Sequence, residues 1–169
     1  MIPIARLFVR TALAYLLVGT LVGASFLVYK GATGRSIPYV LALEHGHLLF
    51  VGFLTMLVMG VALWMFPRPG GTRGGEGRAL WSYWLLHLGL LARVIAEPGA
   101  LWYPGGIWGP LLVFSGLAQG GAVALFVTAV WGRVVSPRAQ WEARQARREP
   151  DDPQHPSSAS DTRLSVTTK

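Results

Sequence analysis

Long apolar stretches, separated by short polar ones, dominate the first 135 residues of the chain. The stretches are Thr11 to Tyr29, about Leu43 to Phe66, about Ala79 to Ala96, and about Gly109 to Trp131. About 20 residues of α-helix, at about 1.5 Å each, cross a hydrocarbon core of about 30 Å. Each stretch therefore predicts one membrane-spanning helix, and together they predict an all-α, integral membrane four-helix bundle.

Prolines mark the expected ends of two spans. Pro67 follows the second span, and the sequence "EPG" at positions 97–99 follows the third. Because proline cannot continue the hydrogen-bonding pattern of a helix, we expect the third span to close at this sequence.

The composition supports the membrane interpretation and narrows the chemistry. Of the 169 residues, 52% are hydrophobic and only 14% are charged, which leaves too little polar surface to cover a soluble globule. The lipid bilayer is the expected partner, and nucleic acid is not. Cysteine is absent, so disulfides, thiolate metal sites and cysteine nucleophiles are excluded. A metal ion must be held by nitrogen, oxygen or methionine sulfur.

The chain is expected to consist of two parts. Residues 1–135 form the four-span transmembrane domain. Residues 136–169 are basic and rich in Pro and Ser, with almost no large aliphatic side chains. Such a segment cannot bury enough apolar surface to offset its ordering entropy, which predicts a disordered C-terminal tail.

The distribution of Lys and Arg predicts the orientation of the spans. Two basic residues precede the first span, two lie in the first loop, three in the second, none in the third, and two begin the tail. Because Lys and Arg are retained on the cytoplasmic side, we expect an N-in, C-in arrangement in the inner (cytoplasmic) membrane, with a cytoplasmic tail. The third loop, "PGALWYPGGIWGP", is uncharged and aromatic, as is typical of the outer interface.

Ionisable residues are concentrated near the outer ends of the second and third spans. The second span begins with Glu44, His45 and His47, and the third contains Arg93 and Glu97. Such residues can reach water near a helix end, and Arg93 and Glu97 have the i,i+4 spacing of an ion pair on one helix. An interfacial polar cluster and a ligand site are both compatible with this pattern.

His87 lies deeper in the third span and needs a partner there. A neutral imidazole that is hydrogen-bonded to a neighbouring helix would satisfy it. One iron bound by both His45 and His87 is not expected, because their depths differ by about 20 Å counted from the inner ends of the helices, or about 10 Å from the outer ends.

Helical geometry separates the two outer histidines. At about 100° per residue, His45 and His47 point about 160° apart and cannot bind one metal ion from a regular helix. His45 shares its face with Leu49, Gly52, Met56 and Gly60, whereas His47 shares an apolar face with Val51, Leu54, Val58 and Val61. The glycines beside His45 predict a shallow groove that a flat ligand or another helix can approach closely.

The second span resembles the low-spin haem helix of the haem-copper oxidase subunit I superfamily, which includes cytochrome c oxidases and nitric oxide reductases. The resemblance covers roughly Leu43 to Arg68, with "HGHLLFVGFLTMLVMGVALWMFPR" at its centre. It is greatest to small cbb3-like members and extends weakly to "WLLHLGLLARVIAEP" (84–98). It implies a haem b cofactor with His45 as axial ligand to the haem iron and Arg93 near a propionate. Gly52, His47 and His87 are the other candidate cofactor-binding residues, and Glu44 and Glu97 complete the polar cluster.

The chain also differs from that family. A complete enzyme of the family has many more helices, and it binds its haems and a copper ion with more histidines than the four in this chain. Catalysis by this chain alone is therefore not expected. Two functions remain open. One is a haem-binding electron-transfer or gas-sensing protein of respiration or denitrification. The other is a cofactor-free accessory subunit that packs against and stabilises a respiratory oxidase or nitric oxide reductase. A homo-oligomer is a further possible assembly.

Overall fold

The computed structural model of the chain describes residues 3–66 and 76–134, together with Trp141 and Gln145. The chain divides into two compact units, Met1–Val134 and Val135–Lys169. Apart from Trp141 and Gln145, the predicted tail lies outside the described residues, and so does the basic loop at 67–75. The membrane-spanning helices belong to the first unit.

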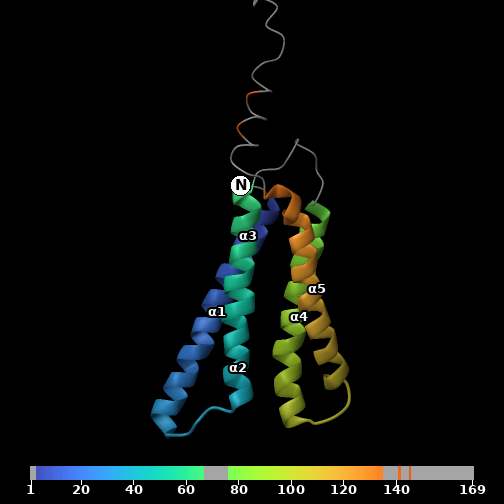
Figure 1. Ribbon diagram of the computed structural model, residues 1–169. Helices are drawn as coiled ribbons and strands as arrows, with labels where there is room; N and C mark the ends of the chain where they lie inside the picture. The colour runs from blue at the N-terminus through green and yellow to red at the C-terminus, as the bar shows by residue number, and fades with distance from the viewer. Residues whose placement is uncertain (1–2, 67–75, 135–140, 142–144, 146–169) are drawn as a thin grey trace, which may run out of the picture. The chain divides into compact units, whose positions relative to one another are not determined.

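Four helical spans make up the described part of this unit (Figure 1). Helix α1 covers Pro3–Thr33. The second span, Tyr39–Met65, is built from α2 (Tyr39–His47), η1 (Leu48–Thr55) and α3 (Met56–Met65). Helices α4 (Glu76–Trp102) and α5 (Trp108–Val130) follow, and the short 3-10 turn η3 covers Trp131–Arg133. All four spans are long and apolar enough to cross a membrane. The predicted all-α, four-span membrane bundle is thus confirmed.

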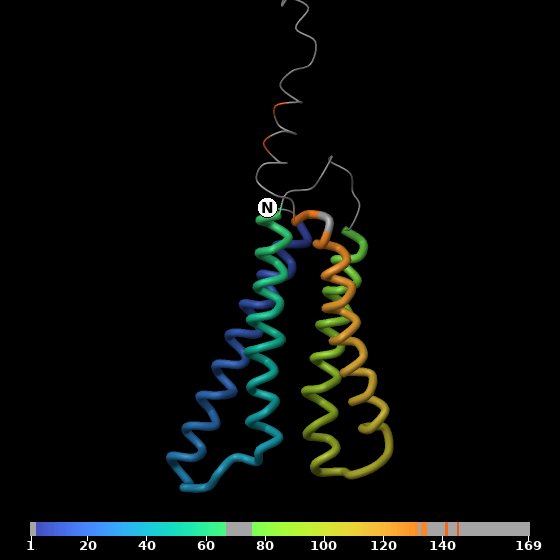
Figure 2. Tube along the Cα trace, in the orientation of Figure 1, coloured from blue at the N-terminus to red at the C-terminus, as the bar shows by residue number. Residues whose placement is uncertain are grey.

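Consecutive spans run in opposite directions. The α1–α2 and α4–α5 connections lie at one end of the bundle, which we call the hairpin end (Figure 1 and Figure 2). The start of α1, the end of α3 and the short turn η3 lie at the other end. The polar residues that begin α2 therefore share an end of the bundle with the last turns of α4.

Helix α4 does not close at the "EPG" sequence, so that prediction is wrong. The helix continues to Trp102 with Pro98 inside it. Pro98 removes only one backbone donor, close to the helix end, and the N–H of Tyr103 donates to the carbonyl of Gly99 at 2.9 Å. A Cβ atom on Gly99 would lie 2.7 Å from the ring of Trp108 in α5. Contact with α5 thus supports a turn that the local sequence disfavours.

Helix α1 is also longer than the uncharged stretch that predicted it. It begins at Pro3 rather than Thr11 and includes Arg6 and Arg10. Both arginines are exposed, so their charges impose no burial cost on the first turns of the helix. Charged residues at the edge of an apolar stretch therefore do not mark the end of this helix.

The second span changes its helical geometry in the middle. Segment η1 is a π-helix of 8 residues, and the hydroxyl of Thr55 donates to the carbonyl of Phe50, five residues earlier, at 2.9 Å. The buried residues through this part of the span recur at every fourth position: Glu44, Leu48, Gly52 and Met56. Such a stripe drifts by about 40° per step on an α-helix. The wider π-helix keeps these residues on one side.

Small residues bring α4 and α5 into close contact. A Cβ atom on Gly89 would lie 3.0 Å from the Cβ atom of Ala118 and 3.1 Å from Cγ of Gln119. Nearby, the hydroxyl of Ser82 donates to the carbonyl of Ala122 at 2.8 Å, and both residues are fully buried. Close backbone approach and an interhelical hydrogen bond are the usual means of helix association in lipid.

Glycines also set the contact between α1 and the second span. Gly60 lies against Phe8 and Val9, and Gly52 lies against Tyr15. Gly19 of α1 in turn receives Leu49, whose Cδ2 would be 2.6 Å from a Cβ atom at position 19. The stripe predicted from the second span therefore faces α1, and this helix fills much of it.

Candidate functional site

Three charged residues meet between α2 and α4. The Nε atom of Arg93 donates to Oε1 of Glu44 at 3.2 Å, and its Nη2 atom donates to Oε1 of Glu97 at 3.0 Å. The Glu44 side chain is only 5% exposed, against 24% for Arg93 and 23% for Glu97. The arginine therefore links a buried carboxylate on one helix to a partly exposed one on another.

This geometry bears out part of the sequence interpretation. The i,i+4 ion pair of Arg93 and Glu97 forms, and the polar residues of the second and third spans do meet at one end of the bundle. Arg93 is thus engaged by two carboxylates of its own chain. A charge paired in this way is less available to a haem propionate than the resemblance implied.

His87 finds a partner on the neighbouring helix. Its Nδ1 atom and the hydroxyl of Tyr15 in α1 share a hydrogen bond of 2.8 Å. Its ring stacks on Tyr83, with centroids 5.8 Å apart and an interplanar angle of 9°, and the Tyr83 hydroxyl is 2.9 Å from the hydroxyl of Thr11. His87 is therefore part of a polar network that ties α1 to α4, one of the alternatives that the sequence left open.

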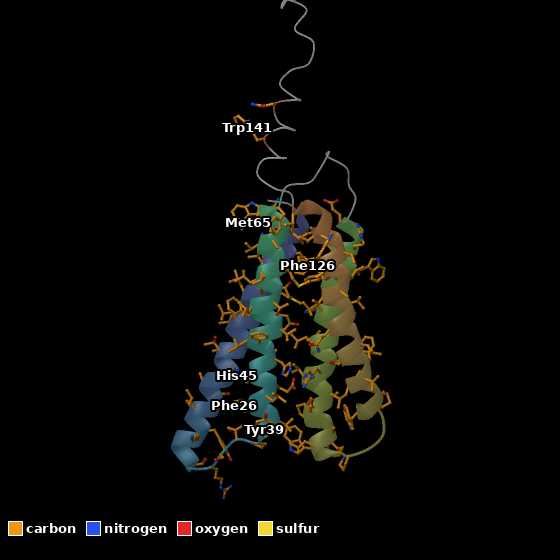
Figure 3. All side chains as sticks on the ribbon, viewed as in Figure 1. Phe26, Tyr39, His45, Met65, Phe126 and Trp141 are labelled. Carbon is orange, nitrogen blue, oxygen red and sulfur yellow. The ribbon has the colours of Figure 1, made fainter. Side chains whose placement is uncertain are left out.

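His45 has a different environment from His87. Its Nδ1 atom is buried and has no hydrogen-bond partner among the described residues. The ring lies against Gly23 of α1, where a Cβ atom would be 2.6 Å from Cε1 of the imidazole. The ring of Phe26 in α1 lies edge-on to the imidazole, at 6.2 Å between centroids (Figure 3).

A cleft of about 710 Å³ opens beside this imidazole, between α1 and α2. Apolar residues from both helices form most of its lining, and His45 is one of its few polar members. The lining residues are Thr20, Gly23, Ala24, Phe26, Leu27, Lys30, Ser36, Ile37, Ala42, His45 and Leu49. An apolar cleft of this size with few polar groups is typical of a cofactor or small-molecule site.

His47 is directed elsewhere, as the predicted separation of the two histidines requires. Its Nδ1 atom lies 3.0 Å from the backbone carbonyl of Leu43, to which it is hydrogen-bonded. It lines a separate groove of about 460 Å³, formed by one side of α2 and the start of η1. The two imidazoles therefore serve different surroundings.

The predicted glycine groove does not form an open site at Gly52. A Cβ atom there would lie 2.7 Å from the Tyr15 ring and 2.9 Å from Leu90. The side chains of two neighbouring helices therefore occupy this part of the groove. Of the two occupants that the sequence allowed, a flat ligand or another helix, a helix is the one present at Gly52.

The five candidate cofactor residues thus do not form one site. His45 lies at the α1–α2 cleft, Arg93 lies in the carboxylate cluster, and His87 lies in the tyrosine network. Within the described ranges, no group of three or more His, Asp or Glu side chains is placed to hold a metal ion. A metal at this cleft would therefore depend on His45 and on a group from outside these residues.

Sequence reasoning missed several residues of α1 that shape these sites. Gly23 and Phe26 contact His45, and Tyr15 binds His87. Tyr15 was the one with a recognisable signal, since a phenol in an otherwise apolar span needs a hydrogen-bond partner. For Gly23 and Phe26, no comparable pattern distinguishes them from the other small and aromatic residues of the helix.

Comparison with known proteins adds no relative. No protein-family model, no curated protein and no solved structure matches this chain.

Proposed function

We propose that this chain is a haem-binding membrane protein of respiratory or denitrification electron transport, with His45 as an axial ligand of haem b. The observation that carries the proposal is the buried Nδ1 atom of His45, which lacks a partner among the described residues and belongs to a side chain that lines an apolar cleft. A buried nitrogen without a partner costs free energy. Metal coordination is one of the ordinary ways in which an imidazole is satisfied.

The size and lining of the cleft support a planar apolar cofactor. Its volume of about 710 Å³ falls within the range of about 300–1,000 Å³ that is common for such sites. Gly23 lacks a side chain where one would collide with the imidazole. Bound haem would supply one-electron transfer, while the protein sets its position and surroundings.

The remaining candidate residues do not complete a two-ligand site within the described part of the chain. His87 is hydrogen-bonded to Tyr15, and His47 to the Leu43 carbonyl. The proposal therefore has a five-coordinate iron, or a second ligand from a partner subunit or a second copy of the chain. This arrangement also explains why the protein is not expected to act as an oxidase on its own.

An absorption spectrum of the detergent-purified protein tests the proposal. We expect a Soret band in the wild type, its loss or strong reduction in His45→Ala, and its retention in the matched variant His47→Ala. The contrast follows from the placement of the two rings, since only His45 lies at the cleft. A colourless wild type after expression with added haem, or a greater loss in His47→Ala, would show the assignment to be wrong.

A second candidate function is supported by the outer face of α5. Gly116, Gly120 and Ala124 are exposed at intervals of four residues, and a Cβ atom on either glycine would have no neighbour within 4 Å. This spacing of small residues promotes close helix association in membranes. It favours a cofactor-free accessory subunit that packs against an oxidase, a nitric oxide reductase or a second copy.

Cysteine cross-linking in native membranes tests the second function. Because the chain has no cysteine of its own, Gly120→Cys introduces a single reactive site. We expect oxidative cross-linking through this position to a partner or a second copy, and little through the control Leu54→Cys, also exposed but on the second span. Equal cross-linking at both positions would remove the support that the α5 face gives to this function.

We also propose the N-in, C-in orientation and the inner membrane as location, on the distribution of Lys and Arg among the loops. A reporter fused after Arg138 is then expected in the cytoplasm, and one inserted near Gly105 on the outer side. The opposite labelling pattern would reverse the orientation and place the His45 cleft on the cytoplasmic side.

A further inference from the structure

The His45 cleft carries its one lysine side chain toward one end, and this asymmetry of charge suggests how its ligand is oriented. The inference rests on the proposed haem-binding function. Among the lining residues, Lys30 is the only lysine or arginine, and Ser36 lies in the connection between α1 and α2. The other lining residues on α1 are Thr20, Gly23, Ala24, Phe26 and Leu27, of which only Thr20 is polar, and it carries no charge.

Helical spacing places Lys30 in line with the imidazole contact. Gly23, which the His45 ring touches, and Lys30 are seven residues apart on α1. Seven residues turn an α-helix by about 700°, so the two positions differ by only about 20° in direction. The rise between them is about 10 Å along the helix, toward the hairpin end. One face of α1 thus presents an imidazole contact and, about two turns further on, an ammonium group.

Haem b has matching chemistry. Its ring is flat and apolar, the iron is at the centre, and both carboxylates are carried as propionates on one edge. The distance from iron to propionate is comparable with the separation along α1. The alternative cation, Arg93, is paired with Glu44 and Glu97 and is not among the residues that line the cleft.

We propose that Lys30 binds a haem propionate and so orients the carboxylate edge of the ring toward the hairpin end of the bundle. Lys30 is exposed and lies in the last turn of α1, from which its long side chain can follow the apolar wall while the ammonium group meets a carboxylate. Lys30 is a binding residue in this proposal, and His45 remains the iron ligand.

A ligand comparison isolates this contact. Haem b and its dimethyl ester, which lacks the carboxylate charges, are titrated into haem-free full-length protein in detergent, and Kd is read from absorbance. We expect Lys30→Gln to raise Kd for haem b about three- to fivefold, the size of an exposed ion pair. The Kd for the ester is expected to be the same in Lys30→Gln as in wild type.

Arg35→Gln provides the matched control, because Arg35 lies in the connection just after the last turn of α1 but does not line the cleft. We expect it to leave both values of Kd unchanged. An equal rise for haem b and the ester in Lys30→Gln would show that Lys30 acts through packing, and no rise for haem b would show that it makes no contact. Either result overturns the inference while the proposed function stands. If the wild type binds neither ligand, the proposed function fails and this inference fails with it.

Discussion

The helices of the α4–α5 pair pack closely against each other, whereas α1 and the second span do so over only part of their length. In the first pair, Gly89 meets Ala118 and Ser82 bonds across to Ala122. In the second pair, glycines let side chains interlock in the middle of the bundle, but a cleft opens toward the hairpin end. A buried imidazole atom without a described partner lies beside the cleft. The difference separates residues whose positions are explained by packing alone from His45, whose Nδ1 atom packing leaves without a partner among the described residues.

The largest effect is expected from disturbing the closely packed pair. Gly89→Leu would place a side chain where even a Cβ atom lies 3.0–3.2 Å from Ala118 and Gln119. We expect a loss of about 3 kcal/mol in the free energy of unfolding, because overpacking against a neighbouring helix backbone cannot relax easily. Thermal unfolding in detergent measures the loss. Gly121→Leu is the control, since nothing lies within 4 Å of a Cβ atom there, and equal destabilisation by both variants would contradict the packing argument.

Removing the charge that joins α2 to α4 should have a smaller effect on stability and little on haem. Arg93→Gln would leave the buried Glu44 without its ionic partner, and we expect a loss of about 2 kcal/mol in unfolding free energy. The Kd for haem is expected to stay within about twofold of the wild-type value, a change of less than about 0.5 kcal/mol in binding free energy. If Arg93→Gln lowered the free energy of haem binding by more than the free energy of unfolding, Arg93 would be a propionate partner after all.

Removal of one hydroxyl tests the mid-bundle link between the two pairs. Tyr15→Phe deletes the hydrogen bond to His87 but keeps the ring that packs on Gly52. We expect a loss of about 1 kcal/mol in unfolding free energy, the usual size of such a bond between membrane helices. Tyr29→Phe, at an exposed position of the same helix, should cost nothing measurable. A shifted or weakened Soret band in Tyr15→Phe would instead indicate that His87 is a haem ligand.

The smallest effect on stability, with a large effect on the ligand, is expected at the cleft itself. Gly23→Leu would displace the His45 ring, because a Cβ atom at this position already comes within 2.6 Å of it. The open cleft can absorb the added volume, so we expect less than about 1 kcal/mol of destabilisation but strong loss of the Soret band. Gly31→Leu, on the same helix with nothing within 4 Å, should retain the band. Retention in both variants would separate His45 from haem binding.

The sequence predicted the spans well because lipid imposes a strong and simple constraint on apolar length. It also gave Arg93 and Glu97 an i,i+4 ion pair, which depends on local spacing. It put Glu44 and Arg93 at the same end of the bundle, which follows from the alternating direction of consecutive spans. It did not predict that α4 would pass through Pro98, which depends on contact with Trp108 in α5.

The interior sites were harder to predict than the spans. Whether a ligand or Tyr15 fills the space at Gly52 depends on the crossing of two helices, which periodicity does not encode. The same holds for the partner of His87. A helical wheel gives the direction of each side chain on its own helix, but the neighbour that it meets is a tertiary property.

The π-helical segment Leu48–Thr55 contains one residue more than an α-helix of the same length would need. Each i→i+5 hydrogen bond encloses one more residue than an α-helical bond, so this segment holds one residue more than an α-helix that would join the same two flanks. Deletion of the exposed Leu54 should therefore convert the segment to α-helix while Glu44 keeps its contact with Arg93 and Gly60 keeps its contact with Phe8. The same deletion in α4 would rotate one half of that helix against the other by about 100°. The second span can thus lose one residue while the side chains at its two ends keep their directions relative to each other.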